Sequence, residues 1–202
     1  MQAVTVYCAS STALEPHFSD AASMVGRELA ARSIRLVYGG GCIGLMGAVA
    51  RATKAAGGKV TGIITRQLVA LEQGWDGCDE LLVVDTMRER KRLLEECGEA
   101  FLILPGGLGT YEEFFEILVG RYLKNHAKPI GVVNDHGYYD PMIAMIDHGV
   151  EHRFIRPAVR DLLFVHHDPV DVINAIVEVA PPRAKASECV AVGSGLAPAR
   201  RD

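Results

Sequence analysis

The sequence predicts a single Rossmann-like α/β domain, in which helices flank a doubly wound and mainly parallel β-sheet. Short apolar runs alternate with helical segments along almost the whole chain, which is the rhythm of βαβ units. The apolar runs show little polar alternation, as expected for strands that helices cover on both faces. The length of 202 residues is enough for one domain with a substantial core.

The expected elements follow this alternation in order. The strands are expected at residues 3–8, 35–38, 59–64, 80–85, 100–104, 129–133 and 162–166. The helices are expected at residues 15–32, 44–56, 87–97, 110–124, 138–151 and 168–179. No internal repeat or linker interrupts them, so residues 1–180 are expected to form one domain. Residues 181–202 begin with two prolines and are rich in Ala, Gly, Ser and Arg, which predicts a flexible C-terminal tail.

The composition argues against several classes of protein. With 49% hydrophobic and 23% charged residues, the chain is typical of globular proteins. Its net charge of −4 gives no reason to expect a nucleic-acid partner, because proteins that bind the phosphate backbone carry a basic excess. No apolar run reaches the roughly 18 residues of a membrane span, so no membrane partner is expected. The first expected strand also leaves no room for a signal peptide.

Five cysteines are scattered along the chain without a CxxC pair. Their odd number and wide spacing favour reduced thiols and therefore a cytoplasmic protein. The cysteines show no metal-ligand pattern, and the adjacent His166 and His167 lie at the end of an expected strand. No metal site is therefore predicted.

Two glycine-rich turns follow expected strands and precede expected helices. The first covers residues 39–47 (GGGCIGLMG) and the second covers residues 105–110 (PGGLGT). Ligands of open α/β sheets bind beyond the carboxyl ends of the strands. The first amides of a helix lack intrahelical partners and favour an anion, and glycine lets the backbone approach it closely. Either turn could therefore hold a phosphate.

The first turn contains the pattern GxGxxG, which is weak by itself. It follows the second strand, and residues 61–65 at the end of the next strand offer no acid for a ribose hydroxyl. The GxxxxGK[ST] pattern of a P-loop is also missing. The turn therefore predicts neither NAD nor ATP binding, and a tight strand-to-helix connection remains an alternative.

The second turn is followed by side chains that could bind substrate or take part in a reaction. Thr110 can bond a phosphate or the start of a helix, and residues 110–113 (TYEE) have the form of a capping box. Glu113 could therefore simply cap the helix. It also lies one helical turn in, where its carboxylate could face a sugar while the amides hold a phosphate.

Taken together, these segments resemble the LONELY GUY family of cytokinin riboside 5′-monophosphate phosphoribohydrolases, many of which were once labelled lysine decarboxylases. The sequence PGGLGTYEE at 105–113 fits the family motif PGGxGTxxE, and MRERK at 87–91 is similar to the family's basic element. The resemblance spans about residues 3–180. Further similar segments are residues 8–11, 37–41, 44–47, 128–131 and 137–140.

The resemblance implies a homodimer that hydrolyses the N-glycosidic bond of cytokinin riboside 5′-monophosphates and AMP, releasing the free base and ribose 5-phosphate. It implies no metal or organic cofactor. The family's catalytic arginine and glutamate fall on Arg90 and Glu113. The substrate-binding positions that it implies are Gly40, Gly41, Glu72, Lys91, Gly106, Gly107, Gly109, Thr110 and Glu112.

The chemistry of these residues fits such a reaction. A carboxylate at Glu113 could stabilise an oxocarbenium-like ribose and orient a water, while Arg90 could stabilise the departing base or contact the phosphate. The crowded apolar residues Phe114, Phe115, Ile117 and Leu118 are expected to contribute to the dimer surface.

Two departures from the family's sequence pattern lie near the expected base pocket. The identity of the preferred base is therefore left open. Arg88 stands where many family members have histidine, and residues 72–77 lack the pattern of the plant enzymes. A purine 5′-nucleotide nucleosidase of nucleotide salvage and a non-catalytic nucleotide or molybdenum-cofactor carrier remain alternatives. Lysine decarboxylation is disfavoured, because no lysine is convincingly placed to form a Schiff base with pyridoxal phosphate.

Overall fold

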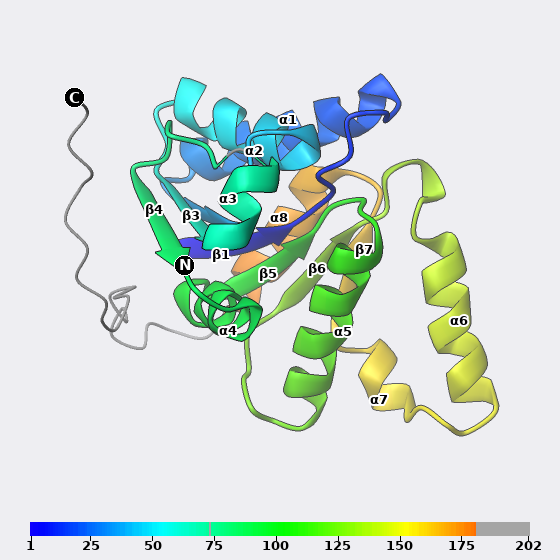
Figure 1. Ribbon diagram of the computed structural model, residues 1–202. Coiled ribbons are helices and arrows are strands. Elements are labelled where there is room, and N and C mark those ends of the chain that lie inside the picture. The colour runs from blue at the N-terminus through cyan, green and yellow to red at the C-terminus, as the bar shows by residue number, and fades with distance from the viewer. Residues whose placement is uncertain (73, 181–202) are drawn as a thin grey trace, which may run out of the picture.

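A seven-stranded parallel sheet lies at the centre of the protein (Figure 1). The computed structural model describes residues 1–72 and 74–180, without the side chains of residues 70–72, so the predicted tail at 181–202 lies outside the described residues. The strand order is β4-β3-β2-β1-β5-β6-β7, and every neighbouring pair is parallel. The strands are β1 (Ala3–Tyr7), β2 (Arg35–Tyr38), β3 (Val60–Thr65), β4 (Glu80–Val84), β5 (Ala100–Ile103), β6 (Ile130–Val133) and β7 (Leu163–His166).

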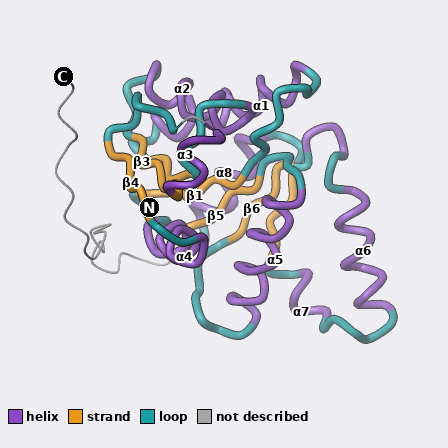
Figure 2. Tube along the Cα trace, viewed as in Figure 1, coloured by secondary structure: helices purple, strands orange, loops and turns teal. Residues whose placement is uncertain are grey.

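Helices cover both faces of this sheet (Figures 1 and 2). One face packs against α1 (Pro16–Ala31), α2 (Gly44–Ala55) and α8 (Pro169–Glu178). The other packs against α4 (Met87–Cys97), α5 (Leu108–Tyr122) and α6 (Asp140–Glu151). The predicted fold class is confirmed. The short helices α3 (Arg66–Glu72) and α7 (Pro157–Arg160) and the 3₁₀ turn η1 (Asp135–Gly137) were not predicted, because so few residues show no clear periodicity.

The central strand β1 shows why its sequence lacks polar alternation. Val4 and Val6 pack into the core on one face of the sheet, and Ala3 and Tyr7 pack into the core on the other. Thr5 is also fully buried, and its hydroxyl donates a hydrogen bond of 2.7 Å to the carbonyl of Leu94. Both faces of the sheet at β1 are therefore shielded from solvent, and the buried Thr5 hydroxyl has a hydrogen-bond partner.

The strand order reverses beside β1, and this determines where a ligand can bind. β2 pairs with one edge of β1 and β5 pairs with the other, so the chain winds outward in opposite directions from this point. Connections that leave the carboxyl ends of β1 and β5 therefore diverge and leave a crevice between them. The second glycine-rich turn follows β5 at this crevice.

Helix α5 departs from the sequence prediction in two ways. It begins at Leu108, two residues before the expected start at Thr110. Three of the residues expected at a dimer surface, Phe114, Ile117 and Leu118, are instead buried in the core of this chain. The expectation was wrong for these three because α5 uses a wide apolar face to cover the sheet.

Two observations concern the cellular setting. Cys8 and Cys78 are free thiols, as expected from the spacing of the cysteines. Among the described residues, no helix combines the length and the apolar character needed to cross a membrane.

Candidate active site

A cavity of about 250 Å³ lies at the carboxyl ends of the central strands. Its walls come from the end of β1 and the loop after it, from the end of β2, and from α2, α4 and α5. The lining residues are Val6, Tyr7, Cys8, Ala9, Ser10, Ser11, Gly39, Met46, Arg90, Gly107, Leu108, Gly109, Thr110 and Glu113. The fold thus brings both predicted catalytic residues and most of the second glycine-rich turn into one site.

The start of α5 is open towards this cavity. Gly107 is the N-cap and provides no side-chain cap, so the amides of Leu108, Gly109 and Thr110 have no intrahelical acceptor. A Cβ atom at Gly107 or Gly109 would meet no other atom within 4 Å, which leaves room for a ligand to approach the backbone. Free amides and the positive end of the helix dipole together favour a phosphate.

Gly106 packs closely against Thr110 within the second glycine-rich turn. A Cβ atom there would lie 2.1 Å from Oγ1 of the buried Thr110, so no larger residue fits without moving the turn. Gly106 itself does not line the cavity. The structure shows that Gly106 allows the turn to fold tightly, and its contact with substrate stays a prediction.

The first glycine-rich turn is hydrogen-bonded to neighbouring backbone. The amides of Leu45 and Met46 at the start of α2 donate to the carbonyl of Ala9, at 3.0 and 3.3 Å. Gly40 accepts a hydrogen bond from the amide of Trp75, and Gly41 forms a β-bridge with Gly74. Neither Gly40 nor Gly41 lines the cavity, although Gly39 and Met46 of the same turn do, so contact of Gly40 and Gly41 with substrate stays a prediction.

Arg90 is held in a fixed position. Its side chain is buried, and Nε donates to the carbonyl of Ile63 at 3.0 Å while Nη2 donates to the carbonyl of Gly39 at 3.2 Å. A Cβ atom at Gly39 would lie 2.3 Å from Nη2, so glycine is needed there for the guanidinium to fit. Nη1 then points towards Glu113, with 3.7 Å between Nη1 and Oε1.

Glu113 is not a capping residue. The N-cap is Gly107, so Thr110 lies inside the first turn and the capping-box interpretation of residues 110–113 is wrong. The Glu113 side chain is only 14% exposed and lines the cavity. Burial raises the pKa of its carboxyl from 4.5 to about 7, even though the Arg90 guanidinium lowers it. A carboxyl with such a pKa can exist in either protonation state near neutral pH.

Two other predicted substrate-binding residues, Lys91 and Glu112, do not line the cavity. Lys91 pairs with Glu112 at 2.5 Å and with Glu116 at 3.2 Å on the outer side of α4 and α5, and the hydrogen bond from Lys91 to Glu112 raises the lysine pKa. Glu72 is the last residue of α3, and its side chain lies outside the described residues. Contact of these residues with substrate stays a prediction.

Several tyrosines support the second glycine-rich turn. Tyr138 donates to the carbonyl of Gly106 at 2.6 Å, and Tyr139 donates to the carbonyl of Leu104 at 2.7 Å. Tyr111 donates to the Tyr138 hydroxyl at 3.3 Å. These bonds hold the carbonyls of the turn on the side away from the helix start. The motif GYYD at 137–140 was noted in the sequence, but spacing alone could not show this role.

Sequence reasoning also missed part of the lining. Ser10, Ser11 and Met46 lie in segments that carry the family resemblance, yet none was chosen as a site residue. Their position directly after β1 or at the start of α2 was the available signal. Cys8 lines the cavity as well, and burial raises the pKa of its thiol, which makes it a neutral wall residue.

The raised pKa of Glu113 predicts a pH-dependent effect on stability. The folded state favours the protonated carboxyl, so its contribution to stability is present at low pH and is lost as pH rises from about 4.5 to about 7. The Glu113→Gln variant has no carboxyl to ionise at this position, so it does not lose this stability as pH rises. We expect the free energy of unfolding of the variant, relative to wild type, to increase by about 2 kcal/mol between about pH 5 and about pH 8.

Urea unfolding at several pH values measures this difference. Glu116→Gln, an exposed change on the same helix, serves as the control. A relative stability that stays constant with pH would show that the Glu113 pKa is not raised.

Solved structures support the fold. The molybdenum cofactor carrier protein of Chlamydomonas reinhardtii superposes with a TM-score of 0.66 at 18% identity, over 88% of this chain and 96% of that chain. A structural genomics target superposes with a TM-score of 0.70 at 18% identity, over 89% of this chain and all of that chain. At such low identity these similarities concern the fold alone.

Sequence comparison goes further. Residues 46–176 match a family described as "Possible lysine decarboxylase". A cytokinin riboside 5′-monophosphate phosphoribohydrolase of Rhodococcoides fascians is 42% identical over 87% of this chain and 89% of that protein. An Arabidopsis thaliana protein of the same name is 42% identical over 88% of this chain and 78% of that protein. The chain therefore belongs to the LONELY GUY family of cytokinin riboside 5′-monophosphate phosphoribohydrolases.

Proposed function

We propose that the protein hydrolyses the N-glycosidic bond of cytokinin riboside 5′-monophosphates and of AMP, releasing cytokinin or adenine and ribose 5-phosphate. The observation that carries this proposal is the pair of Arg90 and Glu113, buried 3.7 Å apart in a cavity that also contains the free amides of α5. The relatives named above are enzymes of this reaction by name, and they are similar to this chain over most of its length.

Substrate binding begins with the phosphate. The amides of residues 108–110 face the cavity at the start of a helix of 15 residues, where a dianion is stabilised by hydrogen bonds and by the helix dipole. Nothing in this turn requires a side-chain cation, so the backbone alone can anchor the 5′-phosphate. This anchor would place the ribose over the second turn of α5, where Glu113 lies.

Bond cleavage then uses the buried pair. Loss of the base leaves positive charge on the ribose, and a Glu113 carboxylate near it would stabilise that charge and orient a water for attack. Negative charge develops on the departing base, and Arg90 would stabilise either this base or the phosphate. Arginine is a poor proton donor because its pKa exceeds about 12, so we assign it charge stabilisation rather than proton transfer.

Three other functions can be compared with this proposal, and the last two of them fit the structure less well. A purine 5′-nucleotide nucleosidase of nucleotide salvage would use the same residues and would differ only in the base that it prefers. A non-catalytic carrier of a nucleotide or of the molybdenum cofactor would need the phosphate loop but gains nothing from a buried pair of opposite charges. For lysine decarboxylation, no described residue that lines the cavity is a lysine, so a Schiff base has no donor there.

We further propose a homodimer and a cytoplasmic location. Support for the dimer comes from the apolar side chains on and after α5 and α6 that remain exposed, since Val119, Leu123, Met145 and Phe154 are each more than half exposed. The odd number and wide spacing of the cysteines support the cytoplasm. Sedimentation equilibrium and cell fractionation test these two proposals.

Product analysis tests the reaction. We expect the purified protein to release base from AMP or N6-isopentenyl-AMP, and adenosine to be a much poorer substrate because it lacks the phosphate anchor. Chromatography of the released base, with GMP and lysine as further substrates, measures this. Equal turnover of adenosine would contradict the assignment of the helix start. Tight nucleotide retention without any cleavage would favour the carrier.

Substitution of Glu113 tests the catalytic assignment. Glu113→Gln keeps the shape of the side chain but removes its charge, so we expect kcat to fall by roughly two orders of magnitude or more. The matched control Glu116→Gln removes a charge one turn further along the same helix, outside the cavity, and should keep near-normal turnover. A folded Glu113→Gln variant with full activity would rule out a catalytic carboxylate at this position.

A further inference from the structure

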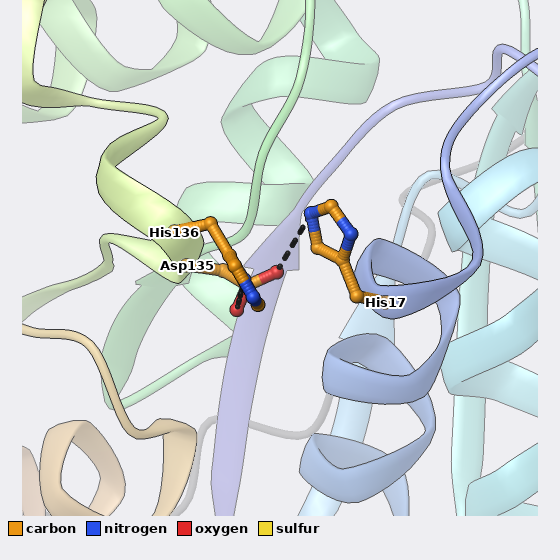
Figure 3. A group of neighbouring side chains, drawn as sticks. All are labelled: His17, Asp135 and His136. Carbon is orange, nitrogen blue, oxygen red and sulfur yellow. Dashed lines mark hydrogen bonds and ion pairs between the residues drawn. The ribbon is translucent and has the colours of Figure 1, made fainter.

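A second cluster of polar side chains lies outside the cavity, at the same edge of the sheet (Figure 3). His17 comes from the first turn of α1, and Asp135 and His136 come from η1, directly after β6. The three side chains converge although His17 is far from the other two in sequence. One ligand atom from each of them lies within 4.8 Å of the others.

Two atoms of this cluster are buried without a hydrogen-bond partner among the described residues. They are Nε2 of His17 and Oδ2 of Asp135, which face each other at 3.7 Å. This separation is too long for a hydrogen bond, and the Asp135 side chain is only 13% exposed. Buried polar atoms are normally satisfied, so an unpartnered pair of this kind requires a ligand or another explanation.

The donor atoms fit one class of ligand. Two imidazoles and one carboxylate form a ligand set that suits zinc and similar transition metals, whereas calcium and magnesium prefer oxygen ligands alone. Ligands that each lie about 2.0–2.2 Å from one zinc ion are roughly 3–4 Å apart. The facing atoms of His17 and Asp135 already have this separation. His136 Nδ1 shares a hydrogen bond of 2.9 Å with the other oxygen of Asp135, and binding of the ion would replace this bond.

We propose that His17, Asp135 and His136 form a binding site for a divalent transition-metal ion, with zinc as the ion that their chemistry fits best. The ion lies between Nε2 of His17 and Oδ2 of Asp135, and His136 provides the third ligand from the exposed side. Solvent completes the coordination. His136 has left-handed backbone angles (φ 49°, ψ 28°), and this conformation holds its ring beside that of His17, with 4.1 Å between the ring centres.

The position of the site indicates a structural role. A bound ion ties the start of α1 to the segment after β6. That segment continues into Tyr138, which contacts Phe18 of α1 edge-on and donates to the carbonyl of Gly106 in the second glycine-rich turn. The ion therefore stabilises the support of this turn from outside the cavity, and the proposed hydrolysis does not depend on it.

A second group of possible ligands must be separated from this site. His148, Glu151 and His152 lie on one exposed face of α6, where two histidines four residues apart can chelate a metal weakly. Their HxxxH spacing runs against the expectation from the sequence that the protein has no metal site. All three are exposed to solvent and none is a buried polar group without a partner, so they carry no comparable inference, but they can bind added zinc in an experiment.

The test therefore starts from the full chain without an affinity tag, carrying His148→Gln and His152→Gln and freed of metal by a chelator. Equilibrium dialysis against zinc chloride, followed by metal analysis, measures bound zinc. We expect one equivalent per chain and a melting temperature that rises with zinc. Adding Asp135→Asn or His17→Gln should weaken zinc binding roughly tenfold or more. His166→Gln, an exposed change outside the cluster, should leave it unchanged.

Circular dichroism confirms that each variant is folded, and Asp135→Asn is nearly isosteric, so at least one informative variant should survive. Loss of zinc in Asp135→Asn and His17→Gln but not in His166→Gln supports the site. Absence of zinc binding in the starting protein overturns the proposal. Zinc binding that neither Asp135→Asn nor His17→Gln weakens also overturns it, and would place the ion elsewhere, for example on a cysteine thiol.

Discussion

The buried arginine at the centre of the cavity connects most of the elements that form it. Arg90 projects from α4 and donates to the carbonyls of Ile63 in β3 and Gly39 at the end of β2. Its remaining nitrogen faces Glu113 in α5. A buried cation without such partners would be very costly, so the two carbonyls that accept its hydrogen bonds must stay in place for the fold to tolerate it. The same contacts fix the geometry of the proposed reaction.

The two glycine-rich turns differ in whether the amides of the helix that follows are hydrogen-bonded to backbone or open to the cavity. At the start of α2 the amides of Leu45 and Met46 donate to the carbonyl of Ala9, which secures the loop after β1. At the start of α5 they remain open to the cavity. Similar sequences at the two turns therefore have different roles, because a neighbouring backbone carbonyl reaches one helix start and not the other. This difference also explains why only one phosphate site is expected.

Much of this was predictable from the sequence, and the limits have physical causes. The strands and long helices were predicted because periodicity reports burial on each face. The meeting of Arg90 and Glu113 was predicted only through the family resemblance, since the two residues lie on different helices. The cap of α5 was misassigned because a local pattern cannot show which residue starts a helix. The convergence of His17 with Asp135 depends on the order of strands in the sheet, which no local spacing reveals.

The protonation state of Glu113 is the central claim about function, because a carboxylate can stabilise a ribosyl cation and a protonated carboxyl cannot. The most direct test is the pH dependence of kcat/KM for AMP hydrolysis, measured for wild type and for the residual activity of Glu113→Gln. The account predicts that the wild-type rate rises with pH through a midpoint near 7, the raised pKa of Glu113, and then levels off. The variant should lack this limb and retain only the titration of the substrate phosphate, whose second pKa is about 6. A wild-type rate that falls through the same range, or a limb that survives in Glu113→Gln, would contradict it.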